Sequence, residues 1–186
     1  HTPGLKVVIP SNPYDAKGLL LSAIRGEDPV IFLEPKRVYR ASKGEVPEGD
    51  YTVPIGQAAV VREGRGVTVL CYGAMVHSVQ EAVEKHGAAA FDPEILDLRT
   101  LAPLDTEAVL ASVRKTGRAV IVYEAPKTCG YGAELAALIA EKAILHLEAP
   151  IARVAGLDTP FPYTLEMEYL PSPERIAKAI ADTARY

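Results

Sequence analysis

The sequence predicts an α/β protein of three layers, with a sheet of parallel strands covered by helices on both faces. Short, nearly continuous apolar runs alternate along the chain with segments in which apolar residues recur at helical spacing. Runs of this kind are typical of parallel strands buried on both faces. Of the 186 residues, 48% are hydrophobic and 24% are charged, which is usual for a globular protein and excludes general disorder.

The first 35 residues predict a strand, a helix and a second strand, as at the end of a doubly wound sheet. Residues 5–10 (Leu-Lys-Val-Val-Ile-Pro) and residues 29–33 (Pro-Val-Ile-Phe-Leu) are the expected strands. Between them, Asn12 can cap a helix and Asp15 can reach the unpaired N–H groups of its first turn. The helix is expected to end at Gly26, and its apolar positions follow helical spacing: Ala16, Leu20, Ala23 and Ile24.

Residues 37–66 differ in character from the segments on either side and predict a crossover between two domains. They carry basic residues, with Gly and Pro at short intervals, and show little amphipathic periodicity. A connection of this length is unusual inside one domain. The alternation of strands and helices resumes at Val67 and continues to the end of the chain.

Residues 67–186 predict a three-layer domain of about 120 residues, which is a common domain size. The apolar runs expected to form its strands are residues 67–73, 95–98, 119–123 and 151–155. Amphipathic segments follow these runs as expected helices, beginning near Met75, at Asp105, near Ala133 and at Ser172. Strands and helices that alternate in this way build a parallel sheet.

Charge and composition exclude several classes of function. Lys and Arg number 20 against 24 Asp and Glu, so the formal net charge is −4. Nucleic-acid and anionic-membrane binders need a concentrated positive field, which this balance does not supply. No apolar run is long enough to span a bilayer, and no signal-peptide pattern is present. We therefore expect an intracellular protein, and the start at His1, without Met and directly before a strand, predicts a piece of a longer chain.

The residues by themselves do not define a reaction. The four His residues are not at metal-binding spacing, and His77 and His86, on or beside one helix, are expected to be solvated or to cap it. Cys71 lies in a predicted strand and is expected in the core. Cys129 lies in a loop where no neighbouring base can be identified, which argues against a reactive thiol.

Two stretches at predicted helix starts have both a structural and a functional interpretation. Residues 130–134 (Gly-Tyr-Gly-Ala-Glu) could hold an anion with backbone N–H groups, but they match no phosphate-binding motif, and a helix-entry turn is favoured. Residues 97–105 (Asp-Leu-Arg-Thr-Leu-Ala-Pro-Leu-Asp) lie at the expected carboxyl edge of the sheet, where α/β proteins bind ligands. Composition alone favours an Asp–Arg network that fixes this loop.

A set of longer motifs carries a resemblance to a known enzyme family. The motifs are residues 1–10 (HTPGLKVVIP), 15–20 (DAKGLL), 32–40 (FLEPKRVYR), 97–105 (DLRTLAPLD), 147–151 (LEAPI) and 158–162 (DTPFP). In this order they span essentially the whole chain, which resembles the β subunit of the thiamine-diphosphate-dependent 2-oxo acid dehydrogenases. Residues 34–36, 124–126 and 158–162 are more similar to the branched-chain type, while residues 72–77 (YGAMVH) also occur in pyruvate-type relatives.

This resemblance implies a fold of two parts and a reaction. Residues 1–36 resemble the tail of a pyrimidine-binding domain, residues 37–66 the crossover, and residues 67–186 a three-layer transketolase C-terminal-like domain. The complete enzyme would be an oxidoreductase that decarboxylates a branched-chain 2-oxo acid oxidatively and transfers the acyl group to a lipoyl arm. The alternatives are a pyruvate dehydrogenase β subunit, or an assembly and docking module for the acyltransferase core without catalytic residues of its own.

The resemblance also implies where cofactors bind. Thiamine diphosphate and magnesium would be held by the complete heterotetramer, because the activating Glu and the His of a His-Ser-Gln motif lie outside this sequence. We therefore expect no catalytic or cofactor-binding residue here, and no activity of this chain alone. A potassium ion is implied just after the first helix, at Ala23, Ile24, Gly26 and Asp28. Relatives often have Asp at the position of Gly26, which here offers only a backbone oxygen.

The partners implied by the resemblance are an α subunit, in a heterotetramer of two α and two β subunits, a second β subunit, and an acyltransferase. The peripheral-subunit-binding domain of the dihydrolipoyl acyltransferase is basic, and it is expected to contact Glu148 and the terminal carboxylate of Tyr186. Nucleic acid and membranes are not expected as partners. The expected location is the cytoplasm, or the mitochondrial matrix in a eukaryote.

Overall fold

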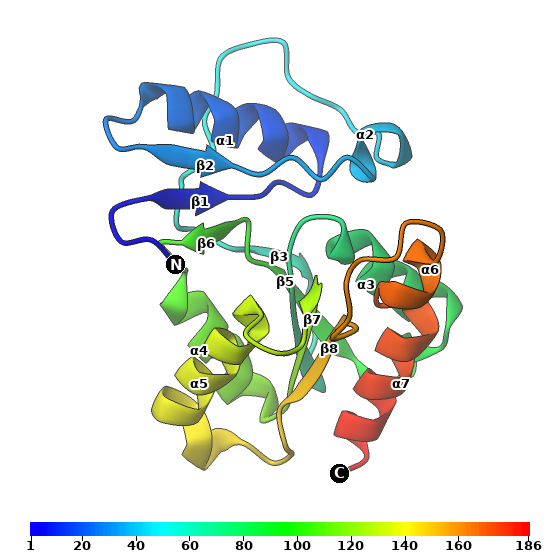
Figure 1. Ribbon diagram of the computed structural model, residues 1–186. Helices are drawn as coiled ribbons and strands as arrows, with labels where there is room; N and C mark the ends of the chain where they lie inside the picture. The colour runs from blue at the N-terminus through cyan, green and yellow to red at the C-terminus, as the bar shows by residue number, and fades with distance from the viewer.

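The strands of the protein form two sheets in the computed structural model, which describes residues 1–186 except for the side chain of Ala41. The smaller sheet consists, in spatial order, of β2 (Val30–Phe32), β1 (Lys6–Val8) and β6 (Thr100–Ala102). The larger sheet consists of β3 (Ala59–Arg62), β5 (Pro93–Asp97), β4 (Val67–Cys71), β7 (Ala119–Pro126) and β8 (Ala152–Gly156). Figure 1 shows the smaller sheet above the larger one.

The unit of strand, helix and strand predicted at the start of the chain is confirmed. Strands β1 and β2 are parallel, and helix α1 (Pro13–Arg25) connects them. The helix begins at the predicted N-cap, Asn12, and its C-cap is Gly26. It buries Leu19 fully, but two of its apolar residues remain exposed, Leu20 by 42% and Ile24 by 70%. The apolar stripe of α1 is thus only partly covered by the described chain.

A strand from the second half of the sequence completes the smaller sheet. Strand β6 follows the end of β5 and pairs antiparallel with β1. The sequence did not predict β6, because three residues within a Pro-containing loop give no strand periodicity. The pairing matters because it carries the chain from the carboxyl end of the large sheet directly into the small one.

Four strands of the larger sheet, β4, β5, β7 and β8, pair in parallel, as predicted. Strand β3 pairs antiparallel with β5 and forms one edge of the sheet. It lies within residues 37–66, as does the short helix α2 (Val38–Ala41), although no element was predicted there. An edge strand that is half exposed lacks the continuous apolar run by which buried strands are recognised.

Helices cover both faces of the larger sheet. One core cluster joins the sheet to α3 (Met75–Lys85) and α7 (Pro173–Ala184), and the other joins it to α4 (Thr106–Thr116) and α5 (Tyr131–Ala143). In Figure 1 these pairs lie on opposite sides of the strands. Short helical turns complete the chain: η1 (Ala88–Phe91), η2 (Ile144–His146) and α6 (Glu166–Tyr169). Among the described residues, no helix has the length and apolar character needed to cross a membrane.

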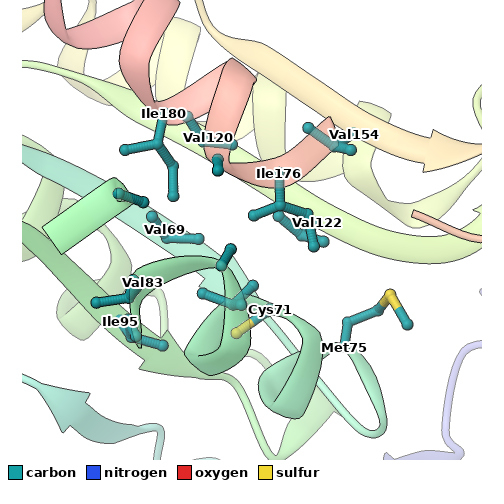
Figure 2. Packing of buried hydrophobic residues seen from close by; sticks show 14 of the residues in the cluster. Val69, Cys71, Met75, Val83, Ile95, Val120, Val122, Val154, Ile176 and Ile180 are labelled. Atoms are coloured by element: carbon teal, nitrogen blue, oxygen red, sulfur yellow. The ribbon is translucent and has the colours of Figure 1, made fainter. Parts of the chain in front are cut away.

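The core between the sheet and helices α3 and α7 is made of interlocking aliphatic side chains. Figure 2 shows Val69, Val120 and Val122 of the sheet packed against Ile176 and Ile180 of α7. Each such side chain contributes about 1.5–3 kcal/mol when it is fully buried. Cys71 is also fully buried in this cluster, and burial raises the pKa of its thiol well above the usual value. Its predicted role as a core residue is confirmed.

Candidate functional site at the junction of the two sheets

The polar residues predicted at the carboxyl edge of the sheet meet the first helix where the two sheets join. Asp97 is the last residue of β5, and β6 begins at Thr100, so the turn between them crosses from one sheet to the other. The start of α1 lies against this turn through side-chain hydrogen bonds. We call the residues that take part the junction network: Ser11, Asn12, Asp15, His77, Asp97 and Arg99.

A buried ion pair lies at the centre of the junction network. Arg99 Nε donates to Asp15 Oδ2 over 2.9 Å, and its Nη2 lies 2.8 Å from Asp15 Oδ1. Asn12 Nδ2 donates to the same carboxylate over 2.7 Å, while the Asp15 backbone N–H donates to Asn12 Oδ1 over 2.9 Å. Asp15 is 1% exposed and the Arg99 side chain 20%. The helix cap and the ion pair therefore share one buried carboxylate.

The predicted Asp–Arg network thus exists, but the Asp that pairs with Arg99 lies outside residues 97–105. Arg99 pairs with Asp15, which the sequence suggested only as a residue of the helix start. Arg99 also has a φ of 56°, which is unusual for a residue with a side chain. Backbone strain of this kind persists where surrounding contacts fix the conformation, and the Asp15 carboxylate supplies such contacts.

The second carboxylate of the junction network, Asp97, is held by other donors. Ser11 Oγ donates to Asp97 Oδ2 over 2.5 Å, and the Arg99 backbone N–H donates to Oδ1 over 3.0 Å. Burial raises the pKa of Asp97 to about 6, against the opposing effect of these hydrogen bonds. His77 Nε2 lies 2.7 Å from the Ser11 carbonyl oxygen, so this His of α3 binds the loop before α1. It was expected to be solvated or to cap its own helix; it is half-buried and contacts the loop before α1 instead of capping α3.

Other residues of the 97–105 segment accept hydrogen bonds from the crossover. Asp105 caps α4 by accepting the Ala108 N–H over 3.1 Å, and it also accepts the Ala58 N–H over 2.9 Å. Thr100 Oγ1 accepts the Gly56 N–H over 3.0 Å. Because both junction carboxylates are occupied by donors from the chain itself, this arrangement suits the positioning of backbone segments.

The residues predicted for a potassium ion lie at the exposed end of α1. The Gly26 N–H donates to the Ser22 carbonyl oxygen over 3.0 Å. The carbonyl oxygens of Ala23 and Ile24, in the last turn of the helix, have no such donor from within the helix. The carboxylate of Asp28 lies 2.8 Å from Lys6 Nζ in an exposed ion pair. Among the groups predicted to bind potassium, the Asp28 carboxylate thus already has a cationic partner within the chain.

The residues predicted for the acyltransferase, Glu148 and Tyr186, are both exposed. Glu148 Oε2 lies 2.6 Å from Arg118 Nη1, and its backbone N–H donates to the Gly117 carbonyl over 2.7 Å. Helix α7 ends at Ala184, two residues before Tyr186, which is 77% exposed. In Figure 1 the turn before β8 and the C-terminus lie toward the end of the molecule farthest from the small sheet.

Of the remaining candidate residues, the glycines of residues 130–134 are fixed by close packing. The α carbons of Gly130 and Gly132 lie against the ring of Tyr123, where an added Cβ would be 2.6 Å and 2.0 Å from ring atoms. This close approach supports the helix-entry interpretation of residues 130–134. Cys129 is exposed, and His86 Nε2 lies 3.6 Å from Glu174 on α7. Within the described chain, no group of three His, Cys, Asp or Glu side chains is placed to hold a metal ion.

Comparison with known proteins places this architecture in the class of transketolase domains. Residues 56–176 match the family model described as the transketolase C-terminal domain, and residues 1–42 match the transketolase pyrimidine binding domain. The chain belongs to the transketolase C-terminal domain family. A solved structure described as a split gene transketolase, an inactive beta4 tetramer, has a TM-score of 0.80 at 25% identity. The similarity covers 98% of this chain and 58% of that one.

Comparison with individual protein sequences gives more specific relatives than the family models do. The chain is 52% identical to the mitochondrial 2-oxoisovalerate dehydrogenase subunit beta of Dictyostelium discoideum, over all of this chain and 50% of that protein. It is 52% identical to the corresponding subunit of Pseudomonas aeruginosa, over 95% of this chain and 54% of the relative. It is 48% identical to the pyruvate dehydrogenase E1 component subunit beta of Staphylococcus aureus, over all of this chain and 58% of that protein. The chain thus spans about half the length of these relatives, and the predicted resemblance is confirmed.

Proposed function

We propose that this chain is part of the β subunit of a thiamine-diphosphate-dependent 2-oxo acid dehydrogenase of the branched-chain type. The observation that carries the proposal is the identity of about half of all positions with 2-oxoisovalerate dehydrogenase β subunits, along the whole chain. The complete enzyme would decarboxylate a branched-chain 2-oxo acid oxidatively and pass the acyl group to a lipoyl arm. A pyruvate dehydrogenase β subunit is the second candidate, supported by 48% identity.

In this proposal the cofactor chemistry belongs to the assembled enzyme. Thiamine diphosphate, when bound, supplies the carbanion chemistry of decarboxylation. We assign magnesium and the diphosphate to the α subunit of a heterotetramer with two α and two β chains, as the resemblance to this family implies. The remaining role for this chain is to position the pyrimidine-binding part against the C-terminal domain. The junction network, which binds the start of α1 to the turn after β5, supports that role.

The domain limits are part of the same proposal. We assign residues 1–36 to the pyrimidine-binding domain, residues 37–66 to the crossover, and residues 67–186 to the C-terminal domain. The family models, which match residues 1–42 and 56–176, support a division of this kind. The pairing of β6 with β1 means that the two parts also share a sheet.

We further propose a potassium site at Ala23, Ile24, Gly26 and Asp28. The unpaired carbonyl oxygens at the end of α1 support it, because they carry partial negative charge toward solvent. Backbone oxygens would supply most of the ligands. The Asp28 carboxylate would have to leave Lys6 in order to join them.

The proposed partners are the α subunit, a second β subunit, and the basic peripheral-subunit-binding domain of a dihydrolipoyl acyltransferase. The exposed carboxylates of Glu148 and of the Tyr186 terminus are the groups proposed to bind this last domain. If the chain acted only through such contacts, it would be a docking module. The exposed position of Glu148 supports that alternative as well.

A chimeric enzyme tests the proposed function. The residues of a 2-oxoisovalerate dehydrogenase β subunit that align with this chain are replaced by the chain itself, and the chimera is expressed with its α subunit. We expect turnover of 3-methyl-2-oxobutanoate with a higher kcat/KM than for pyruvate. The reverse preference would favour the pyruvate enzyme. A correctly assembled chimera without turnover would support the docking module.

A further inference from the structure

The junction network holds two buried carboxylates and one guanidinium. Asp15 and Asp97 are each 1% exposed. Arg99 directs Nε and Nη2 of its side chain to Asp15, while the donors to Asp97 are the Arg99 backbone N–H and the Ser11 hydroxyl. In the described part of the chain, no other cation lies within ion-pair distance of either carboxylate. A buried carboxylate without a cationic partner favours its protonated form, so the network is suited to take up one proton.

The described elements packed around Asp97 bring other titratable groups close to it. In the sheet its partners are Cys71 of β4 and Ala59 of β3. Burial raises the pKa of the Cys71 thiol well above its usual value, so the thiol stays neutral. On α3, His77 Nε2 donates to the Ser11 carbonyl oxygen over 2.7 Å, because a carbonyl can only accept. His77 therefore contacts the loop before α1, and its imidazole is a second group at the junction that can titrate.

The pKa of Asp97 agrees with this arrangement of charges. Burial raises it to about 6, hydrogen bonds from Ser11 and from the Arg99 backbone lower it, and the Asp15 carboxylate raises it. Asp97 thus binds its proton more tightly than an exposed Asp, whose pKa is about 4.

The Asp97 carboxylate binds the loop that leads into α1. Ser11 Oγ lies 2.5 Å from Asp97 Oδ2, although the two residues are 86 positions apart in the sequence. When Asp97 carries a proton, either oxygen of this contact can donate to the other. When Asp97 is ionised, only Ser11 can donate, and a second negative charge lies near Asp15 in the buried network. Loss of the proton therefore weakens the attachment of the loop to the end of β5.

Backbone pairing at the junction remains when this contact weakens. Strands β1 and β6 are paired beside it (Figure 1), and the Ile9 N–H donates to the Arg99 carbonyl oxygen over 2.8 Å. These backbone groups do not titrate, so the shared sheet keeps the two parts of the chain joined. The loop before α1 can move about this pivot together with the first turn of the helix. Such movement releases the cap hydrogen bonds from the Asp15 and Ala16 N–H groups to Asn12.

We propose that the junction network is a pH-sensitive contact between the two parts of the chain. With its proton bound, the network holds the loop before α1 against the end of β5. Transfer of that proton from Asp97 to water frees the loop and the first turn of α1. The inference goes beyond the proposed function, because it concerns the movement of the pyrimidine-binding part against the C-terminal domain and not the reaction.

Amide hydrogen exchange of the purified chain at pH 5 and pH 8 tests this inference. After correction for intrinsic exchange rates, the opening constant of residues 11–19 should be about tenfold larger at pH 8. The reason is that the pKa of Asp97 is about 6 in the closed contact and about 4 in the open one. Residues 131–143 of α5 contribute nothing to the junction network and should show no such change. Equal opening constants of residues 11–19 at the two pH values overturn the proposal.

Two variants identify the group that titrates. Asp97→Asn imitates the protonated acid, because its amide both donates and accepts, so we expect the pH dependence to disappear. His77→Gln is the matched control: it removes the other titratable group, keeps a side-chain donor, and should leave the tenfold change intact. A pH dependence that survives in Asp97→Asn, or that disappears in His77→Gln, overturns the proposal.

A third variant tests the contact with both carboxylates in place. Ser11→Ala removes the hydroxyl that joins the loop to Asp97, so it should raise the opening constant of residues 11–19 about fivefold at pH 5. This measurement decides the matter even when Asp97→Asn does not fold, because an unchanged opening constant overturns the proposal as well. None of these measurements involves turnover, so their failure leaves the dehydrogenase assignment to the chimeric enzyme.

Discussion

Arg99 Nε donates to Asp15 Oδ2 over 2.9 Å, although the two residues are 84 positions apart in the sequence. Asp15 belongs to the first turn of α1 and Arg99 to the turn between β5 and β6. The contact therefore joins the part of the chain that matches a pyrimidine binding domain to the part that matches a transketolase C-terminal domain. Its contribution to stability is open to direct measurement.

We expect Arg99→Met to destabilise the chain by about 3–5 kcal/mol, because it leaves the Asp15 carboxylate buried without its cationic partner. The double variant Asp15→Asn/Arg99→Met should lose less than the sum of the two single variants, since neither partner then carries an unpaired charge. Urea unfolding gives these free energies. The exposed pair of Arg25 and Asp50, whose side chains are 50% and 68% exposed, is the control, and its loss should cost about 0–1 kcal/mol. Equal costs for both pairs would contradict the prediction.

The second prediction concerns Asp97 and pH. Because the pKa of Asp97 is raised to about 6 in the folded chain, the folded state binds the proton more tightly than the unfolded state. Its contribution to stability is therefore complete below about pH 4, the unfolded pKa, and is lost as pH rises through about 6. We expect the free energy of unfolding of the wild type, relative to Asp97→Asn, to fall by a few kcal/mol between pH 4 and pH 7. Urea titrations at several pH values measure this difference, and parallel pH profiles would refute the assignment.

Local patterns in the sequence predicted the elements with strong signals and missed those without them. The runs that form β4 and β7 are apolar at nearly every position and were found, as was the capped start of α1. Strand β6 has three residues and exists because β1 offers it a free edge, which no local pattern reveals. The pairing of Asp15 with Arg99 could not be predicted for the same reason, because the distance between these residues depends on how the two sheets meet.

The third prediction is that this chain alone does not decarboxylate 2-oxo acids. We expect no turnover of 3-methyl-2-oxobutanoate in the presence of thiamine diphosphate and magnesium, because the chain spans about half of its relatives and the family resemblance assigns the activating Glu, the active-site His and the diphosphate site to parts of the enzyme outside it. Release of carbon dioxide is the measurement, with the complete heterotetramer of a relative as the positive control. Turnover proportional to the concentration of the purified chain would overturn the expectation.

The fourth prediction concerns the proposed potassium site. We expect potassium chloride to raise the thermal unfolding midpoint above that in tetramethylammonium chloride at equal ionic strength. A tenfold excess over the dissociation constant would stabilise the folded chain by about 1.4 kcal/mol. Lys6→Gln frees the Asp28 carboxylate, so it should enlarge the potassium effect if that carboxylate is a ligand and leave it unchanged if backbone oxygens suffice. Identical unfolding midpoints in the two salts would contradict the proposed potassium site.

The last prediction concerns Glu148, whose carboxylate is exposed and lies 2.6 Å from Arg118 Nη1. If a basic domain of the acyltransferase binds here, Glu148→Lys should weaken its binding to the assembled enzyme at least about tenfold, since loss of one partner from a desolvated charge pair costs about 2–5 kcal/mol. Calorimetric titration with the isolated domain measures the affinity. Glu141→Lys makes the same charge change at an exposed position of α5 and should have little effect. Glu148→Gln should fall between the wild type and Glu148→Lys, because it removes the charge without reversing it. Unchanged affinity at low salt in both Glu148 variants would exclude this residue from the docking surface.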